Sequence, residues 1–200
     1  GTTLAAATPA PIAAPVLPES GWKPLITATT TPPHLPGKRE WSDKRLHLLL
    51  NAVNTETPHA DGALRARIQF QNGSRAAGLV ARSKITGESY KLNVLDQGSV
   101  SLNVIGAKGQ RLETLGRHAF PKPLAAGDLV TLELRVQGDR LTGLVNGTAV
   151  IEARDTRYPD AGTWGIVADD GWFETAEVQV LPPAHAEPWQ DVLRDPAKLQ

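Results

Sequence analysis

The sequence predicts an all-β protein built as a sandwich of two antiparallel sheets. Residues 129–172 contain two tight turns, Gly138-Asp139 and Asn146-Gly147, between segments in which apolar and polar residues alternate. Turns of this kind between alternating segments predict consecutive β-hairpins. About ten such segments occur in the chain, which is too many for one flat sheet, so we expect two packed layers.

The N-terminal region precedes the predicted strands. Residues 1–20 are mostly Ala, Pro and Thr, a composition typical of an extended linker that holds a domain away from a membrane or another domain. A disordered tail has the same composition. In residues 21–45 the Pro-Pro and Pro-Gly pairs argue against regular structure, while Trp22 and Trp41 can cover an edge of the core.

Alternation with a period of two then predicts the strands in order. One side of each strand meets the core and the other side meets water. The predicted strands are residues 46–53, 64–70, 89–95, 99–105, 130–136, 140–145, 148–153, 163–168 and 172–181. Pro182-Pro183 closes this series. We therefore expect one sandwich domain over residues 21–183, followed by residues 184–200 as a tail or the start of another module.

Composition narrows the classes of partner. Twenty-one acidic residues balance 21 basic ones, so no long-range field favours nucleic acid. The chain has no cysteine and hence neither disulfides nor thiolate metal sites. No run of about 18 apolar residues occurs, so we expect no membrane contact by this chain. Since it begins at Gly1 without a signal peptide, we expect an excised part of a longer protein with other domains.

Five short motifs resemble a known superfamily. They are AGLVAR at 77–82, SYKLNV at 89–94, GDLVTLELRVQG at 127–138, LVNG at 144–147 and GTWGIV at 162–167. Together they resemble the concanavalin A-like lectin/glucanase superfamily, and within it the laminin-G-like domains and the bacterial 3-keto-disaccharide hydrolase (DUF1080-like) domains. The resemblance covers roughly residues 46–181.

The resemblance implies a jelly-roll sandwich, preceded here by an extended N-terminal segment. In such domains the concave face or the connecting loops hold a carbohydrate or a protein partner. It also implies an extracytoplasmic location, periplasmic or extracellular, in a larger protein that a segment outside this chain can tether to a membrane.

The predicted loop Asp169-Asp170-Gly171 is the first candidate binding region. Exposed tryptophan stacks on the apolar C–H face of a sugar ring, and Trp172 follows this loop directly. We expect Trp164, on the other side of the loop, in the core. Asp169 and Asp170 can contribute oxygen ligands to calcium, although Asp-Gly is also ordinary turn chemistry. We expect no other cofactor and no other metal site.

Three arginines form the second candidate region. Arg65 and Arg67 alternate with core residues of one predicted strand, and Arg82 ends another segment. If all three point outward into one concave groove, they can bind hydroxyl or carboxylate groups. The alternative is a solvated sheet surface.

Catalytic motifs are missing from the sequence. Glycoside cleavage requires two suitably spaced carboxyl groups, yet the Glu-x-Asp-x-Glu signature of glucanase relatives is absent. Glu174 and Glu177 would project to opposite faces unless a bulge intervenes. No nucleophile elbow, phosphate loop or zinc spacing of histidines occurs. The sequence favours a non-catalytic binding module for glycan or protein; the alternatives are a hydrolase of a (3-keto-)disaccharide and a structural spacer.

Overall fold

The computed structural model describes residues 15–27, 38–42 and 44–183, and nearly all regular structure in them is β. Two short 3₁₀ turns, Glu19–Gly21 and Ala107–Gly109, complete the elements. The strands are β1 (Lys23–Pro24), β2 (Lys38–Ser42), β3 (Arg45–Asn54), β4 (Gly62–Gln69), β5 (Ala76–Ser83), β6 (Ser89–Leu95), β7 (Ser99–Ile105), β8 (Arg111–Ala119), β9 (Leu129–Gln137), β10 (Arg140–Val145), β11 (Thr148–Arg154) and β12 (Thr163–Val180).

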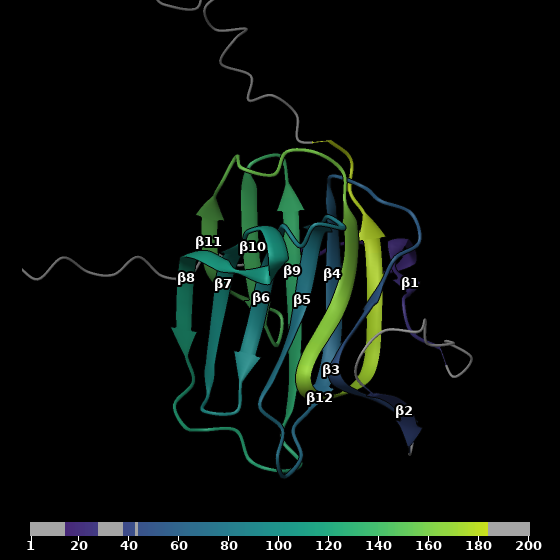
Figure 1. The fold of residues 1–200 in the computed structure, drawn as a ribbon, viewed down its shortest axis with the longest axis vertical. Coiled ribbons are helices and arrows are strands. Elements are labelled where there is room, and N and C mark those ends of the chain that lie inside the picture. Colours follow the sequence, from purple (N-terminus) through teal and green to yellow (C-terminus); the bar gives the residue numbers. More distant parts are fainter. Residues whose placement is uncertain (1–14, 28–37, 43, 184–200) are drawn as a thin grey trace, which may run out of the picture.

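The strands form two layers that share β12 (Figure 1). The first half of β12 pairs with β3 and β5, and its second half pairs with β4 and β1. One layer therefore runs β2-β3-β12-β5-β6-β7-β8, and the other runs β11-β10-β9-β4-β12-β1. Every pairing is antiparallel, as predicted. We call them the β6 layer and the β9 layer.

The core lies between the layers and follows the predicted alternation. Every second residue of β4, β6, β7 and β9 is fully buried and joins one apolar cluster. Trp164 is completely buried in this cluster, as expected. The Asn146-Gly147 turn has positive φ at both residues, 48° and 81°, which is the conformation that a tight hairpin turn requires.

The predicted acidic loop does not exist, because residues 163–180 form one continuous strand. The register explains this. Ala168 pairs with Asn51 and Asp170 pairs with Leu49, so the register with β3 continues across Asp169 and Leu50, although these two residues do not pair with each other. Leu50 has a positive φ of 46°. β12 thus continues through residues 169–171 without a turn, and the expected boundary there is wrong.

Three further strands, β1, β2 and β8, were not predicted. β8 lacks strict alternation, because register shifts interrupt its pairing with β7. β2 lies within the segment that its prolines marked as irregular and pairs with β3.

The N-terminal segment contacts the β9 layer before Gly21, where the sequence places the start of the domain. The Glu19 carboxylate accepts two hydrogen bonds from Arg65. The N–H of Leu25 donates to the carbonyl of Ala176, and Ile26 is buried in the core. The larger part of the expected linker and the expected tail, residues 1–14 and 184–200, lie outside the described residues.

Candidate functional site

Trp172 and Asp170 lie in one cavity at the position where β12 passes between the layers. Its volume is about 430 Å³, and Arg45, His47 and Gln71 also line it. The imidazole of His47 lies parallel to the Trp172 indole, with 4.2 Å between ring centroids. One face of the indole is therefore covered, and a sugar ring could stack only on the other. We call this cavity the Trp172 pocket.

The two neighbouring aspartates point to different surfaces. Asp170 Oδ1 lies 2.8 Å from His47 Nε2, in the Trp172 pocket. Asp169 instead acts electrostatically on Lys91 of β6, two strands away in the β6 layer. Within the described residues, no group of three histidine or acidic side chains is placed to hold a metal ion. Because both residues lie in one strand, their side chains point to opposite sides, which separates the carboxylates that the sequence placed side by side as calcium ligands.

Arg65 and Arg67 lie on the outer surface of the β9 layer and are engaged in ion pairs. Arg65 donates to Glu177 and Glu19, and its guanidinium lies 4.3 Å above the Trp22 ring. The Glu19 carboxylate, followed by Glu177, raises the pKa of Arg65 above its usual range. Arg67 pairs with Glu174 at 3.1 Å and remains 52% exposed.

Arg82 was expected to point outward, but its side chain is buried and only 1% exposed. It donates to the carbonyls of Ala60, Tyr158 and Gly138 and to the carboxylate of Asp61. Its φ is +51°, which interrupts the alternation of β5 one residue before the end of the strand. Arg82 therefore ties three loops together and cannot share a groove with Arg65 and Arg67.

Glu174 and Glu177 also differ from expectation. A bulge between Phe173 and Thr175 changes the register with β4. Because of it, both carboxylates reach arginines of the same outer surface, Glu174 pairing with Arg67 and Glu177 with Arg65. Each carboxylate is half-buried and tied to a cation.

The outer surface of the β6 layer carries a group of polar side chains that the sequence reasoning did not single out. On β6 and β7 the core takes every second residue, so the residues between them face outward. The register then aligns the outward residues of neighbouring strands in two rows. One row is Lys91, Asn103 and Thr114, and the other is Asn93, Ser101 and Arg117. We call these six residues the polar face.

Hydrogen bonds fix one part of the polar face. Thr114 Oγ1 donates to Asn103 Oδ1 at 2.8 Å. The Nδ2 of Asn103 donates in turn to Ser101 Oγ at 2.9 Å. Asn103 is only 2% exposed. This chain of bonds holds side chains of β7 and β8 in defined positions before any ligand arrives.

A glycine makes room for the other part. Gly78 lies beside Asn93 in the register of β5 and β6, and a Cβ at Gly78 would come within 2.4 Å of Asn93 Oδ1. Asn93 therefore lies close over the backbone of β5. Its Oδ1 is buried and has no hydrogen-bond partner among the described residues. A buried amide oxygen without a partner is costly, so it is an acceptor ready for a ligand group.

Lys91 contributes a cation at the centre of the same surface. Burial lowers its pKa from the usual range, and Asp169 opposes this shift. Lys91 makes no hydrogen bond or ion pair that would fix its ammonium group elsewhere within residues 38–42 and 44–183. The polar face thus combines amide, hydroxyl and ammonium groups over the apolar Val80 of the neighbouring strand.

Comparisons with solved structures identify the fold. The carbohydrate binding module CBM66 from Bacillus subtilis superposes with a TM-score of 0.55 at 18% identity, over 80% of this chain and 92% of that module. The chain has a concanavalin A-like jelly-roll fold. Galectin LEC-6 of Caenorhabditis elegans matches with a TM-score of 0.51 at 18% identity, over 70% of this chain and 99% of the galectin.

Other jelly-roll proteins are enzymes. The kappa-carrageenase from Zobellia galactanivorans matches with a TM-score of 0.54 at 9% identity, over 72% of this chain and 81% of the enzyme. Neither a protein-family model nor a curated protein matches the sequence. At these identities the similarity establishes the fold and leaves the function to the residues of the site.

No helix in the described part of the chain is long and apolar enough to cross a membrane.

Proposed function

We propose that this jelly-roll domain binds carbohydrate and that the polar face is its binding surface. The observation that carries the proposal is the unpartnered Oδ1 of Asn93, which lies beside Lys91 and the hydrogen-bonded row of Ser101 and Asn103. A solvated sheet surface would leave such groups in water. Here Asn103 is buried, Lys91, Asn93 and Ser101 are half-buried, and hydrogen bonds fix the side chains of Ser101 and Asn103.

The chemistry of the polar face matches that of a sugar. A hydroxyl group both donates and accepts a hydrogen bond. Adjacent hydroxyls can therefore donate to Asn93 Oδ1 while they accept from Lys91 or from an Asn93 amide hydrogen. Val80 and Val167, which flank Gly78 and Gly165, offer apolar contact for the C–H groups of the ring. Sites of this kind combine an apolar floor with a few positioned polar groups.

We further propose that the domain is non-catalytic. Glycoside cleavage requires two carboxyl groups on either side of the scissile bond. Asp169 is the acidic side chain that acts on Lys91, whereas Asp170 is bonded to His47 in the Trp172 pocket. Glu174 and Glu177 are paired with arginines on the other layer. A catalytic pair is not assembled by these four carboxylates.

The Trp172 pocket and Asp169 extend this proposal beyond the polar face. Asp169 acts on Lys91, and its neighbour in the chain, Asp170, lines the Trp172 pocket, so β12 connects the two regions. A longer glycan that occupies the polar face could then reach Trp172. We also propose that the domain works outside the cytoplasm as part of a larger protein, which is where free glycans are met. The similarity to a carbohydrate binding module and a galectin supports the ligand class.

A glycan array with the wild-type domain tests the proposal. We expect binding of at least one glycan class without release of sugar products. Arg117→Ala on the polar face should weaken it, whereas Arg67→Ala on the β9 layer should not, which makes the two substitutions a matched pair. Release of monosaccharide would show a hydrolase. Binding that only Arg67→Ala reduces would place the site on the other layer, and no binding at all would favour a spacer or a protein ligand.

A further inference from the structure

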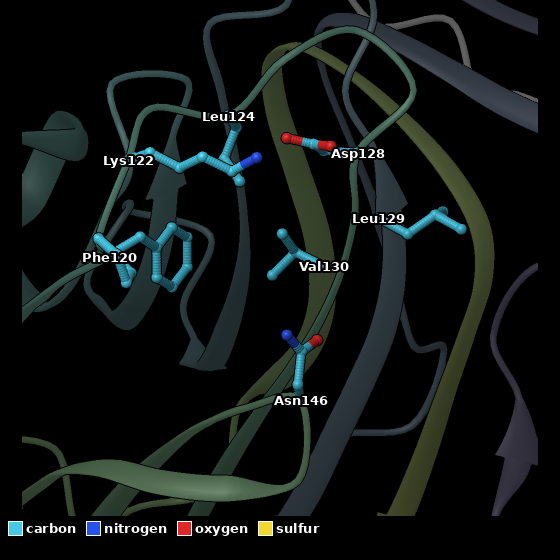
Figure 2. A pocket seen from close by; sticks show the side chains of 8 residues that line it. Phe120, Lys122, Leu124, Asp128, Leu129, Val130 and Asn146 are labelled. Atoms are coloured by element: carbon cyan, nitrogen blue, oxygen red, sulfur yellow. The ribbon is translucent and has the colours of Figure 1, made fainter.

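A second cavity, which shares no lining residue with the polar face or the Trp172 pocket, lies beside the Asn146-Gly147 turn. Its volume is about 370 Å³, within the range of small-molecule sites. Figure 2 shows the ring of Phe120 facing Val130, with Asn146 at one end of the cavity and Lys122 and Asp128 at the other. We call it the Phe120 pocket.

Asn146 is held in one orientation by the strand beside it. Its backbone N–H donates to the carbonyl of Thr131 at 2.8 Å, and its Oδ1 accepts from the N–H of Thr131 at 2.9 Å. This pair of bonds uses the amide oxygen and leaves the Nδ2 hydrogens free. Figure 2 shows the Nδ2 end turned toward the cavity. The turn thus presents a fixed donor rather than a flexible side chain.

The opposite wall is fixed by the loop between β8 and β9. The N–H groups of Phe120 and Leu124 donate to the carbonyls of Gly98 and Asp96 at 2.7 and 2.8 Å. Asp128 Oδ2 accepts from the N–H of Ala125 at 2.8 Å, which orients the carboxylate and leaves Oδ1 free. Within the described ranges Lys122 has neither a hydrogen bond nor an ion pair.

We propose that the Phe120 pocket is a second binding site, which takes a single neutral, polyhydroxylated ring such as one sugar residue. Three features select this class. Phe120, Leu124 and Val130 form an apolar surface for C–H groups. Asp128 accepts from hydroxyls, while Asn146 and Lys122 donate to them. Asp128 and Lys122 carry opposite charges, so the pocket has no net charge that would favour a charged ligand over a neutral one.

This second site is independent of the proposed function. The polar face lies on the outer surface of β6, β7 and β8, whereas the Phe120 pocket is built by the β8–β9 loop, the start of β9 and the β10–β11 turn. If both sites bind, one domain can engage two sugar residues, which raises its apparent affinity for a branched or multivalent glycan.

The test is an NMR titration of the ¹⁵N-labelled chain with galactose, glucose, mannose and fructose in turn, followed through the side-chain amide signal of Asn146. That signal is assigned by its loss in the Asn146→Asp variant. Aspartate still accepts a hydrogen bond from the N–H of Thr131 and tolerates a positive φ. We expect at least one sugar to shift the Asn146 signal and the backbone signals of residues 120–130 in the millimolar range.

Two variants separate this site from the polar face. Asp128→Asn keeps an acceptor for Ala125 and should abolish the shifts at Asn146 while glycan binding by the polar face persists. Asn93→Ala should leave the shifts at Asn146 unchanged. Thermal melting confirms that both variants are folded.

The proposal is overturned if none of the four sugars shifts the Asn146 signal, or if Asn93→Ala abolishes that shift. Titration with glycine and leucine gives a third outcome. Shifts with these zwitterions and none with sugars would show that the opposite charges of Lys122 and Asp128 select a charged ligand, and would also overturn the assignment.

Discussion

Asn93 lies over Gly78 so closely that a Cβ on Gly78 would stand 2.4 Å from the Asn93 Oδ1 and 2.5 Å from the carbonyl oxygen of Leu92. The position of a polar side chain on β6 thus depends on the absence of a side chain on β5. This contact links the architecture of the sheet directly to the proposed binding surface.

We predict that Gly78→Ala weakens glycan binding and destabilises the domain by about 1 to 3 kcal/mol, as overpacking does. The methyl group must displace the Asn93 amide and strain the backbone of Leu92. Urea denaturation gives the stability, and titration calorimetry gives the affinity. Gly73→Ala is the control for backbone strain alone: its φ of +90° disfavours a side chain, but nothing lies within 4 Å of a Cβ there, so it should lower stability without changing affinity. Unchanged affinity in a folded Gly78→Ala variant would contradict the role of Asn93.

Arg82→Leu is predicted to cost about 3 to 5 kcal/mol of unfolding free energy, because it leaves the Asp61 carboxylate, which is only 13% exposed, without its cation. The carbonyls of Ala60, Tyr158 and Gly138 lose their donor as well. Arg67→Ala should change stability by less than about 1 kcal/mol, since exposed ion pairs contribute little. Chemical denaturation measures both. Equal effects of the two substitutions would refute the structural role of Arg82.

We predict that the domain loses stability on acidification because of His59. Burial lowers its pKa from 6.5, its ring stacks on Trp164, and its Nε2 has no partner in the part of the chain that the structure describes. The unfolded chain therefore binds the proton more readily than the folded one, so the unfolding free energy falls as the pH drops below about 6.5. Melting temperatures measured across pH 7 to 4 should fall less steeply for His59→Gln than for the wild type.

Trp172→Ala should weaken the binding of long glycans by roughly tenfold and leave short ones unaffected. The reason is that the Trp172 pocket shares no residue with the polar face, so only a ligand that extends along β12 beyond Asp169 can contact both. Calorimetry with a series of chain lengths measures this, and Trp22→Ala on the β9 layer serves as the control. A uniform loss across all chain lengths would instead place Trp172 at the primary site.

Removal of metal ions should leave glycan binding unchanged. Asp169 and Asp170 diverge toward Lys91 and His47 and cannot chelate one ion together. Titration in the presence of EDTA checks this. A loss of affinity that calcium restores would contradict this, because it would show that a calcium ion takes part in glycan binding.

The layered fold could be predicted from the sequence because alternation records which side of a strand is buried. One example is the first alternating segment, in which all four predicted core residues are buried: Leu64, Ala66, Ile68 and Phe70. Alternation fails where the backbone departs from a regular strand. Asp169, Asp170 and Gly171 have the composition of a turn, yet they lie in the middle of β12, opposite a Leu50 with positive φ.

The polar face could not be recognised for a different reason. Outward polar residues on a strand have the same period whether they are solvated or form a site. The distinction lies in contacts between strands, such as Gly78 beside Asn93 and Asn103 beside Thr114, which depend on register. The Lys-x-Asn pattern of β6 and the Ser-x-Asn pattern of β7 are visible in the sequence, but only the register of the two strands brings them together.

Arg82 shows the opposite error. Its place after Ala77, Leu79 and Ala81 predicts an outward side chain, but its positive φ turns it into the interior. No feature of the sequence near Arg82 indicates that conformation.

The most direct test of the account is chemical-shift mapping of the domain with a glycan that it binds on the array. The account predicts that the largest shifts fall on Lys91, Asn93, Ser101 and Asn103, and that Asn93→Ala abolishes them in a folded protein. Shifts confined to the outer surface of the β9 layer, around Arg65 and Arg67, would contradict it.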